Sequence, residues 1–145
     1  MLSSLQRYAD LGLLVLRIGV GLSYVFLHGW GKMFGGPERW ERTGSAVSAI
    51  GIDFGHTFWG FMAAFSEFAG GILIVLGLFF RPACILIFIT MFVAAARDIA
   101  GEDGIRGSAH PLKMAFVFLG LTAIGPGRYS VDSWLAGRRA VRSKM

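Results

Sequence analysis

The chain has 145 residues, of which 54% are hydrophobic and 16% are charged. Soluble domains usually carry charges at about a quarter of their positions, so this composition excludes an ordinary soluble domain and indicates a membrane protein. The single cysteine, Cys84, excludes an internal disulfide and any chemistry that needs a dithiol. The formal net charge of +5 is expected to serve contact with anionic lipid, and no nucleic-acid partner is expected.

Four apolar stretches follow one another along the chain, covering residues 9–34, 56–80, 82–99 and 110–124. A hydrocarbon core of about 30 Å requires about 20 helical residues, and each stretch is close to that length. The first is too long for the apolar part of a signal peptide, so it is expected to remain as a helix. The sequence therefore predicts an all-α fold, a membrane-embedded bundle of four transmembrane helices that forms one domain over residues 1–145.

Two segments outside these stretches are amphipathic. In the long connection after the first stretch, Pro37 can open a helix, and apolar residues recur at helical spacing as far as Ile50. After the fourth stretch, Ser130 is a suitable N-cap, and Trp134 follows at a position suited to lipid headgroups. We expect the first to be a short helix that lies on the outer interface or caps the bundle, and the second to be a short interfacial helix.

Four crossings place both termini on one side of the membrane. Lys and Arg number seven on that side and six on the other, when Arg17 inside the first stretch is not counted. Four of the seven lie close together in the C-terminal tail, and this density favours the cytoplasm for both ends. These tail residues are Arg138, Arg139, Arg142 and Lys144.

The polar residues of the first stretch are spaced by four, three, four and four, which places them on one face of a helix. Ionisable groups within a membrane helix usually face the bundle interior or a hydrated cavity. The residues of this face are Arg17, Gly21, Tyr24, His28 and Lys32.

A buried arginine requires a partner, and the second stretch holds one carboxylate near its middle, Glu67. At a rise of about 1.5 Å per residue, Arg17 and Glu67 lie roughly 10 Å and 16 Å from the same end of the bundle. We therefore predict an Arg17–Glu67 ion pair, with Gly70 and Gly71 allowing the two helices to approach. Such a pair could equally do no more than fix the register of the helices.

Several helices bring polar groups to the end of the bundle opposite the termini. We expect a pocket that opens there, with a basic mouth and the Arg17–Glu67 pair as its floor. The alternative remains that the cations only extend to lipid headgroups and that the histidines are packing residues. The groups concerned are His28, Lys32, Arg97, Asp98, His110 and Lys113.

No resident cofactor or metal is expected. The three histidines, His28, His56 and His110, come from different predicted segments and show no metal-ligand spacing. A haem held by two of them has little support.

Three stretches resemble the DoxX family of small four-helix bacterial membrane proteins: "LRIGVGLSYVFLHGWGKMFG", "EFAGGILIVLGLFFRPA" and "GPGRYSVDSW". The resemblance extends over nearly the whole chain. The matching positions are Arg17, Gly19, His28, Gly29, Lys32, Glu67, Gly70, Gly71, Gly125, Gly127, Tyr129, Ser130 and Asp132.

The resemblance implies a bacterial cytoplasmic-membrane protein with a redox role, similar to the membrane subunit of a thiosulfate:quinone oxidoreductase. The expected function is thus that of a subunit of a quinone-linked oxidoreductase that handles small sulfur species, with a soluble or membrane oxidoreductase as partner. The quinone would carry the electrons, and no reaction is assigned to the chain by itself. The alternative is a non-catalytic scaffold or small-molecule binding protein that docks a redox partner.

The polar residues provide specific expectations for such a site. Those expected to exchange protons are His28 and Glu67. Those expected to bind a quinone headgroup or a small anion are Arg17, Tyr24, Lys32, Arg97 and His110.

Overall fold

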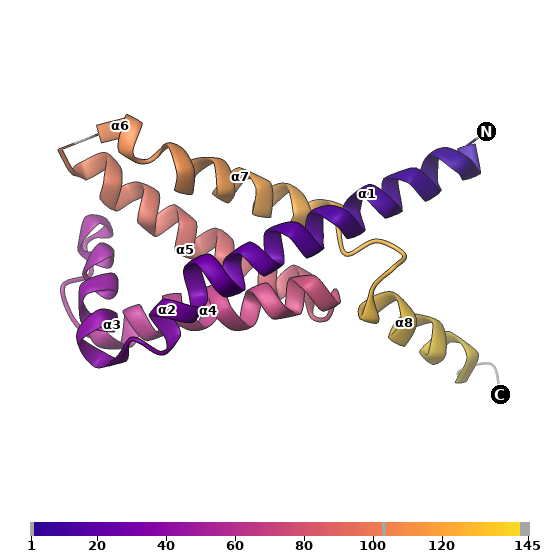
Figure 1. Cartoon of the computed structure of the whole chain (residues 1–145), viewed down its shortest axis with the longest axis horizontal. Helices are drawn as coiled ribbons and strands as arrows, with labels where there is room; N and C mark the ends of the chain where they lie inside the picture. The colour runs from indigo at the N-terminus through magenta and orange to yellow at the C-terminus, as the bar shows by residue number, and fades with distance from the viewer. Residues whose placement is uncertain (1, 103, 143–145) are drawn as a thin grey trace.

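The computed structural model describes residues 2–102 and 104–142, and the side chains of residues 7–102 and 104–138. This part of the chain is almost entirely helical and contains no β-strand (Figure 1). Its helices are α1 (Leu2–Ser23), the π-helix η1 (Tyr24–Gly29), α2 (Trp30–Met33), α3 (Gly36–Gly44), the 3₁₀-helix η2 (Ser45–Ile50), α4 (His56–Leu76), α5 (Phe80–Ala100), α6 (Gly104–Gly107), α7 (Ala109–Ile124) and α8 (Val131–Arg142).

The long helices run back and forth, so that the N- and C-terminal ends of the chain lie at one end of the molecule and α3 and α6 at the other (Figure 1). Three segments are long and apolar enough to cross a membrane: Arg7–Met33, His56–Leu76 and Phe80–Ala100. The fourth predicted span coincides with α7, which has 16 residues and reaches only about 24 Å. The protein is therefore an integral membrane protein with an all-α fold.

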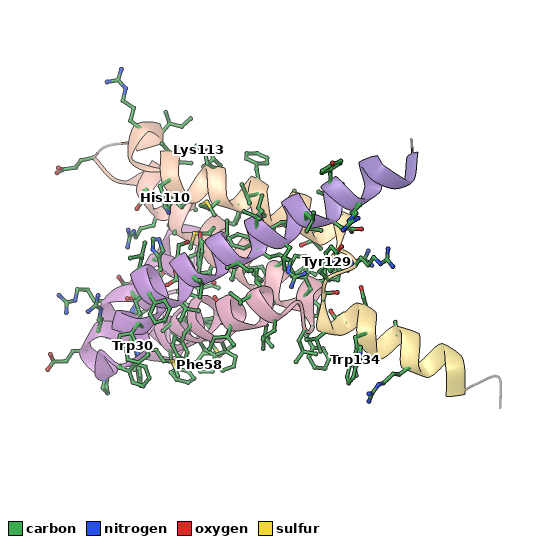
Figure 2. The ribbon with its side chains drawn as sticks, turned by 45° about the vertical axis from the view of Figure 1, so that its right-hand side comes forward. Trp30, Phe58, His110, Lys113, Tyr129 and Trp134 are labelled. Carbon is green, nitrogen blue, oxygen red and sulfur yellow. The ribbon has the colours of Figure 1, made fainter. Side chains whose placement is uncertain are left out.

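Exposed aromatic side chains lie towards both ends of the long helices. Trp30 and Phe58 lie at the α3 end, where they are 52% and 58% exposed, and Trp134 on α8 is 54% exposed (Figure 2). Tryptophan and tyrosine are enriched where a membrane protein meets the headgroup region. Their positions agree with a bundle whose long axis crosses the bilayer.

The core lies where α4, α5 and α7 meet the first helix. Ile74, Phe80, Ile87 and Phe118 are fully buried there, together with Cys84. The predicted close approach of the first two long helices is confirmed at Gly71, where a β-carbon would lie 2.9 Å from the carbonyl oxygen of Gly21. Gly70 faces α5 instead, since a β-carbon there would lie 3.2 Å from the side chain of Ile87.

The predicted helix after Pro37 is α3, and it packs tightly on the start of α4. A β-carbon at Gly60 would clash with the carbonyl oxygen of Trp40, and one at Gly44 would clash with that of His56. The indole Nε1 of Trp40 also donates a hydrogen bond to the carbonyl oxygen of Lys32, at 2.8 Å. These contacts hold α3 against the start of α4, so that α3 covers the end of the bundle opposite the chain termini.

The predicted Arg17–Glu67 ion pair is wrong. Arg17, which is 1% exposed, instead donates hydrogen bonds to four backbone carbonyl oxygens. Two belong to the last turn of α4 and two to the segment after α7. The distances are 3.0 Å to Ile74, 3.0 Å to Val75, 2.6 Å to Pro126 and 2.9 Å to Tyr129.

The physical reason is the C-terminal end of α4. The last carbonyl groups of a helix have no partner within the helix, and the helix dipole gives that end a partial negative charge. The C-terminal end of α4 therefore stabilises the guanidinium of Arg17 without a carboxylate. Glu67 lies earlier along α4 than Ile74 and Val75, whose carbonyl groups accept these hydrogen bonds.

The glycine-rich motif after α7, residues 125–132, contacts the start of α5 as well as Arg17. Both carboxylate oxygens of Asp132 accept hydrogen bonds at 3.0 Å, from the backbone N–H groups of Phe79 and Phe80 at the start of α5. The hydroxyl of Ser130 accepts a hydrogen bond from the N–H of Ser133 at 3.2 Å, which confirms it as the cap of α8.

Candidate ligand-binding cavity

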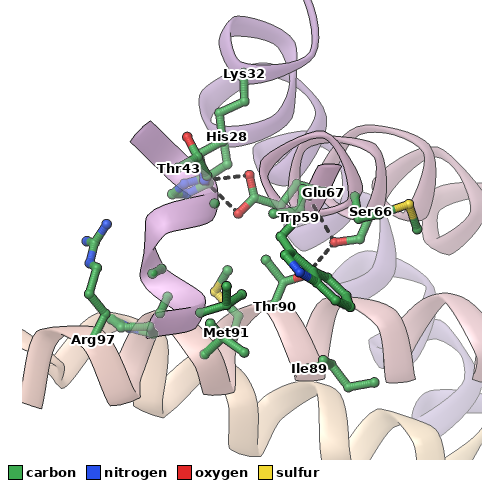
Figure 3. A pocket seen from close by; sticks show the side chains of 18 of the residues that line it. His28, Lys32, Thr43, Trp59, Ser66, Glu67, Ile89, Thr90, Met91 and Arg97 are labelled. Carbon is green, nitrogen blue, oxygen red and sulfur yellow. Dashed lines mark hydrogen bonds and ion pairs between the residues drawn. The ribbon is translucent and has the colours of Figure 1, made fainter. Parts of the chain in front are cut away.

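A cavity of about 590 Å³ lies between α4 and α5, at the α3 end of the bundle (Figure 3). Residues from η1, α2, α3, η2, α4, α5 and α7 line it. Five of the seven predicted site residues are among them, namely His28, Lys32, Glu67, Arg97 and His110. The other two, Arg17 and Tyr24, do not line it.

Tyr24 instead belongs to the wall behind the cavity. It is 1% exposed, and its ring packs on those of His28 and Phe118 with 5.0 Å between ring centroids in each case. Tyr24 therefore supports His28 from the core side, and its expected contact with a ligand has no basis in this arrangement.

The floor of the cavity contains an ion pair that joins the first helix to α4. The Nζ of Lys32 donates a hydrogen bond to Oε1 of Glu67 at 2.8 Å and lies 2.7 Å from Oε2. Glu67 is completely buried, whereas the side chain of Lys32 is 27% exposed. The Oε2 atom is close to the ammonium group but has no hydrogen-bond donor in the described part of the chain.

The π-helix η1 accounts for the position of these side chains. A π-helical turn closes i→i+5 hydrogen bonds and is wider than an α-helical turn. Within it, a β-carbon at Gly29 would lie 2.6 Å from the Cα of Phe68 on α4, so the widened turn is pressed against that helix. His28 and Lys32 are thereby brought over α4 at the level of Glu67.

His28 forms a stacked pair with His110 of α7. The ring centroids are 5.4 Å apart and the planes differ by 17°. His28 is half-buried and His110 is exposed, so the pair extends from the cavity towards the surface of the bundle.

Two hydroxyl groups in the wall of the cavity form a hydrogen bond with each other. The Oγ of Ser66 on α4 lies 2.6 Å from Oγ1 of Thr90 on α5. The nearby indole Nε1 of Trp59 is buried and has no hydrogen-bond partner among the described residues. Sequence reasoning missed all three residues, because single hydroxyl or indole groups in apolar helices give no periodic signal.

A comparison with protein families identifies the chain. The DoxX family model matches residues 12–97, which is more than half of the chain. The protein belongs to the DoxX family. No curated protein and no solved structure matches it. The match covers the first three long helices and ends at Arg97, so it includes four of the five predicted residues that line the cavity but not the glycine-rich motif after α7.

The cavity of this DoxX protein is charge-balanced, and the expectation of a basic mouth is corrected. Lys32 is paired with Glu67, and Arg97 lies 2.8 Å from the carboxylate of Asp98, which also lines the cavity. The formal charges of the lining residues therefore sum to zero when both histidines are neutral. Lys113, which was expected near the mouth, is exposed on α7 and does not line the cavity.

The cavity also extends to the lipid-facing surface of the DoxX protein. Leu86 and Ile89 line it, and they are 38% and 50% exposed near the middle of α5. Phe58 lines it from α4 and is 58% exposed. An apolar molecule dissolved in the bilayer could therefore enter from the side, while the polar end of the cavity lies towards His110 and Arg97.

No group of three or more His, Cys, Asp or Glu side chains suitable for a metal ion occurs in the described part of the chain. The side chains that line the cavity offer hydrogen bonding and proton exchange. Its donors are the ammonium of Lys32, the indole of Trp59 and the hydroxyl pair, and its exchangeable groups are the two histidines.

Proposed function

We propose that this DoxX protein binds a membrane quinone in the cavity between α4 and α5, as the quinone-binding subunit of an oxidoreductase. The single observation that carries the proposal is the combination of a charge-balanced polar end with an apolar lateral opening. A quinone has this distribution of polarity, with two carbonyl groups on its ring and an apolar tail that is soluble in the bilayer. Ligand sites of this kind are usually apolar, with a few polar groups that fix orientation.

The two carbonyl groups of the ring have suitable partners at different depths. Lys32 or His28 can donate a hydrogen bond to one of them. The hydroxyl of Thr90, which otherwise donates to the carbonyl oxygen of Leu86, can turn to donate to the other. The tail would leave between Leu86 and Ile89 into the hydrocarbon region. In this arrangement the buried Glu67 holds Lys32 in place and can accept a hydrogen bond from the hydroxyl of the reduced ligand.

A small sulfur anion is less well suited to this cavity than a quinone. Thiosulfate carries two negative charges, and transferring an ion into a site without net positive charge is costly. We therefore assign the oxidation of the sulfur species to the partner protein. Two thiosulfate ions would form the S–S bond of tetrathionate and release two electrons. One quinone would take up these two electrons and two protons to become the quinol.

The proposal includes four membrane crossings, with α7 as the shortest, and both termini in the cytoplasm of a bacterial cell. The chain ends lie at the same end of the molecule (Figure 1), and the basic residues of the tail favour the cytoplasm. Reporters of cytoplasmic and of external location, fused to the C-terminus, test this. A C-terminal reporter that is active only outside the cytoplasm would contradict it.

Quinone binding can be tested on the purified protein in lipid nanodiscs. Decylubiquinone should produce a saturable increase in the unfolding temperature, and thiosulfate should not. The variant Ala94→Phe places a ring in the cavity and should abolish the increase, since Ala94 lines it. The control Ala100→Phe adds the same ring at an exposed position outside the cavity on the same helix, and it should respond as the parent protein does.

Absence of a saturable shift for decylubiquinone in the parent protein would contradict the proposal. The alternative role as a scaffold for a redox partner would then be favoured. An equal response of the Ala94→Phe and Ala100→Phe variants would show that the quinone binds elsewhere.

A further inference from the structure

We propose that His28 and His110 form the proton port of the cavity, through which protons enter from the α3 end of the bundle when the quinone is reduced. The inference rests on the proposed function and adds to it the route and the side of proton uptake. It concerns two residues on different helices, η1 and α7, that are 82 positions apart in the sequence.

The two rings are stacked and no hydrogen bond joins them, so proton exchange between them would pass through a bridging water. Their centroids are 5.4 Å apart in a nearly parallel arrangement, and both rings line the same cavity. Within the described part of the chain, no side-chain or backbone group forms a hydrogen bond with either ring. The ring nitrogens are therefore available to a bound ligand on the inner side and to water at the exposed face of His110.

The other ionisable residues that line the cavity are paired with one another, which leaves the two histidines without a counter-charge. Lys32 of α2 and Glu67 of α4 neutralise each other, as do Arg97 and Asp98 of α5. Tyr24 of η1 packs behind His28 and is ordinarily neutral. Two imidazolium ions at this separation would repel each other, so a proton on one ring disfavours a second proton on the other.

The redox state of the ligand should then be coupled to this proton. An oxidised quinone can only accept hydrogen bonds. It should therefore bind more tightly to a charged imidazolium, which can only donate, than to a neutral imidazole whose lone pair points towards the quinone. On reduction, the quinone gains two electrons from the sulfur compound and two protons, one on each ring oxygen. The protons would pass in succession from water to His110, from His110 through a bridging water to His28, and from His28 towards the ligand.

The test measures proton uptake when decylubiquinone binds to the full-length protein in nanodiscs. Isothermal titration at about pH 7 in two buffers of different ionisation enthalpy gives the number of protons taken up, and histidine titrates in this range. The parent protein should take up a fraction of a proton, and its affinity should fall about threefold to tenfold between pH 6 and pH 8. His28→Gln and His110→Gln should each lose most of the uptake and of the pH dependence.

The third histidine of the chain provides a matched control. His56 lies near Ser48 and Glu41 and does not line the cavity, so His56→Gln should retain the uptake of the parent. Because His110 is exposed, His110→Gln is expected to fold even if His28→Gln does not.

The outcomes separate the two proposals. Binding of decylubiquinone without proton uptake, or with an uptake that survives in His110→Gln, would overturn the proton port and leave the quinone site standing. A parent protein that does not bind decylubiquinone would overturn both.

Discussion

The ammonium group of Lys32 lies 2.7 Å from a carboxylate oxygen of Glu67, and this contact joins the end of the first membrane helix to the middle of α4. The two residues differ in their access to water. Lys32 retains some exposure, whereas Glu67 has none. Loss of one partner should therefore have a different effect on the protein from loss of the other.

We predict that Lys32→Met destabilises the protein by about 3–5 kcal/mol, because it leaves the carboxylate of Glu67 buried without a counter-charge. Glu67→Leu should cost less, since the remaining ammonium can reach water. The double variant should recover most of the loss caused by Lys32→Met. Denaturant unfolding in mixed micelles measures all three, and additive effects of the two substitutions would contradict the pairing.

Arg17 should be irreplaceable by lysine. Its planar guanidinium reaches four carbonyl oxygens on two segments, whereas a lysine ammonium is a single point of charge. We predict that Arg17→Lys loosens the segment from Gly125 to Ser130, with amide hydrogen exchange there faster by at least about tenfold.

The control for this measurement is Arg128→Lys, at an exposed position in the same segment. It should leave the exchange unchanged. Equal exchange in the Arg17→Lys variant and the parent protein would show that the carbonyl contacts do not hold the segment.

The crossing of α3 over α4 should tolerate no side chain at Gly60, where a β-carbon would clash with the backbone of Trp40. We predict that Gly60→Ala lowers the unfolding temperature and weakens decylubiquinone binding, because α3 leads directly into η2 at the wall of the cavity. Gly19→Ala, where a β-carbon meets nothing within 4 Å, should be neutral or stabilising by up to about 1 kcal/mol. A stable Gly60→Ala protein would show that the crossing can widen without cost.

The hydroxyl of Thr90 should contribute to quinone affinity. Thr90→Val keeps the shape of the side chain but removes a group that lies 2.6 Å from Ser66 in the cavity. We predict that decylubiquinone binds about threefold to tenfold more weakly to this variant, as expected for the loss of one hydrogen bond.

Thr122→Val is the matched control for this substitution. Thr122 also donates to the carbonyl oxygen four residues earlier, as Thr90 does, but it lies on α7 outside the cavity. Equal affinities of the two variants would exclude a role for the Thr90 hydroxyl.

The sequence allowed the long helices to be predicted with small errors at their ends. The larger errors are at the start of the first helix, predicted at residue 9 and found at Leu2, and at the end of α4, predicted at residue 80 and found at Leu76. The second of these has a clear cause. The reason is local chemistry. Gly77 takes a left-handed conformation with φ of 65°, which ends the helix, and Pro82 then lies in the first turn of α5, where its missing N–H is tolerated.

The candidate cavity was predicted in part. Helical spacing brought His28 and Lys32 to one face, and the order of the helices brought Arg97 and His110 to the same end. The partner of Arg17 was not predictable in this way, because residue periodicity describes side chains and the partners are backbone carbonyl groups. The charge balance of the cavity depends on the pairing of Lys32 with Glu67. Because Glu67 was predicted to pair with Arg17, Lys32 was left without a partner and the mouth was predicted to be basic.

The π-helix η1 has a consequence for comparisons of length within the family. Each α-helical residue advances the helix by about 100°, and the wider turn absorbs roughly one residue before α2 begins. Consider a relative whose first helix is α-helical throughout. To keep the contact of Arg17 with the end of α4 and that of Lys32 with Glu67, it would need one residue fewer between the two equivalent positions. In an alignment, a single-residue gap between Tyr24 and Gly29 would mark the relatives that lack this turn, and with it the present placement of His28 beside α7.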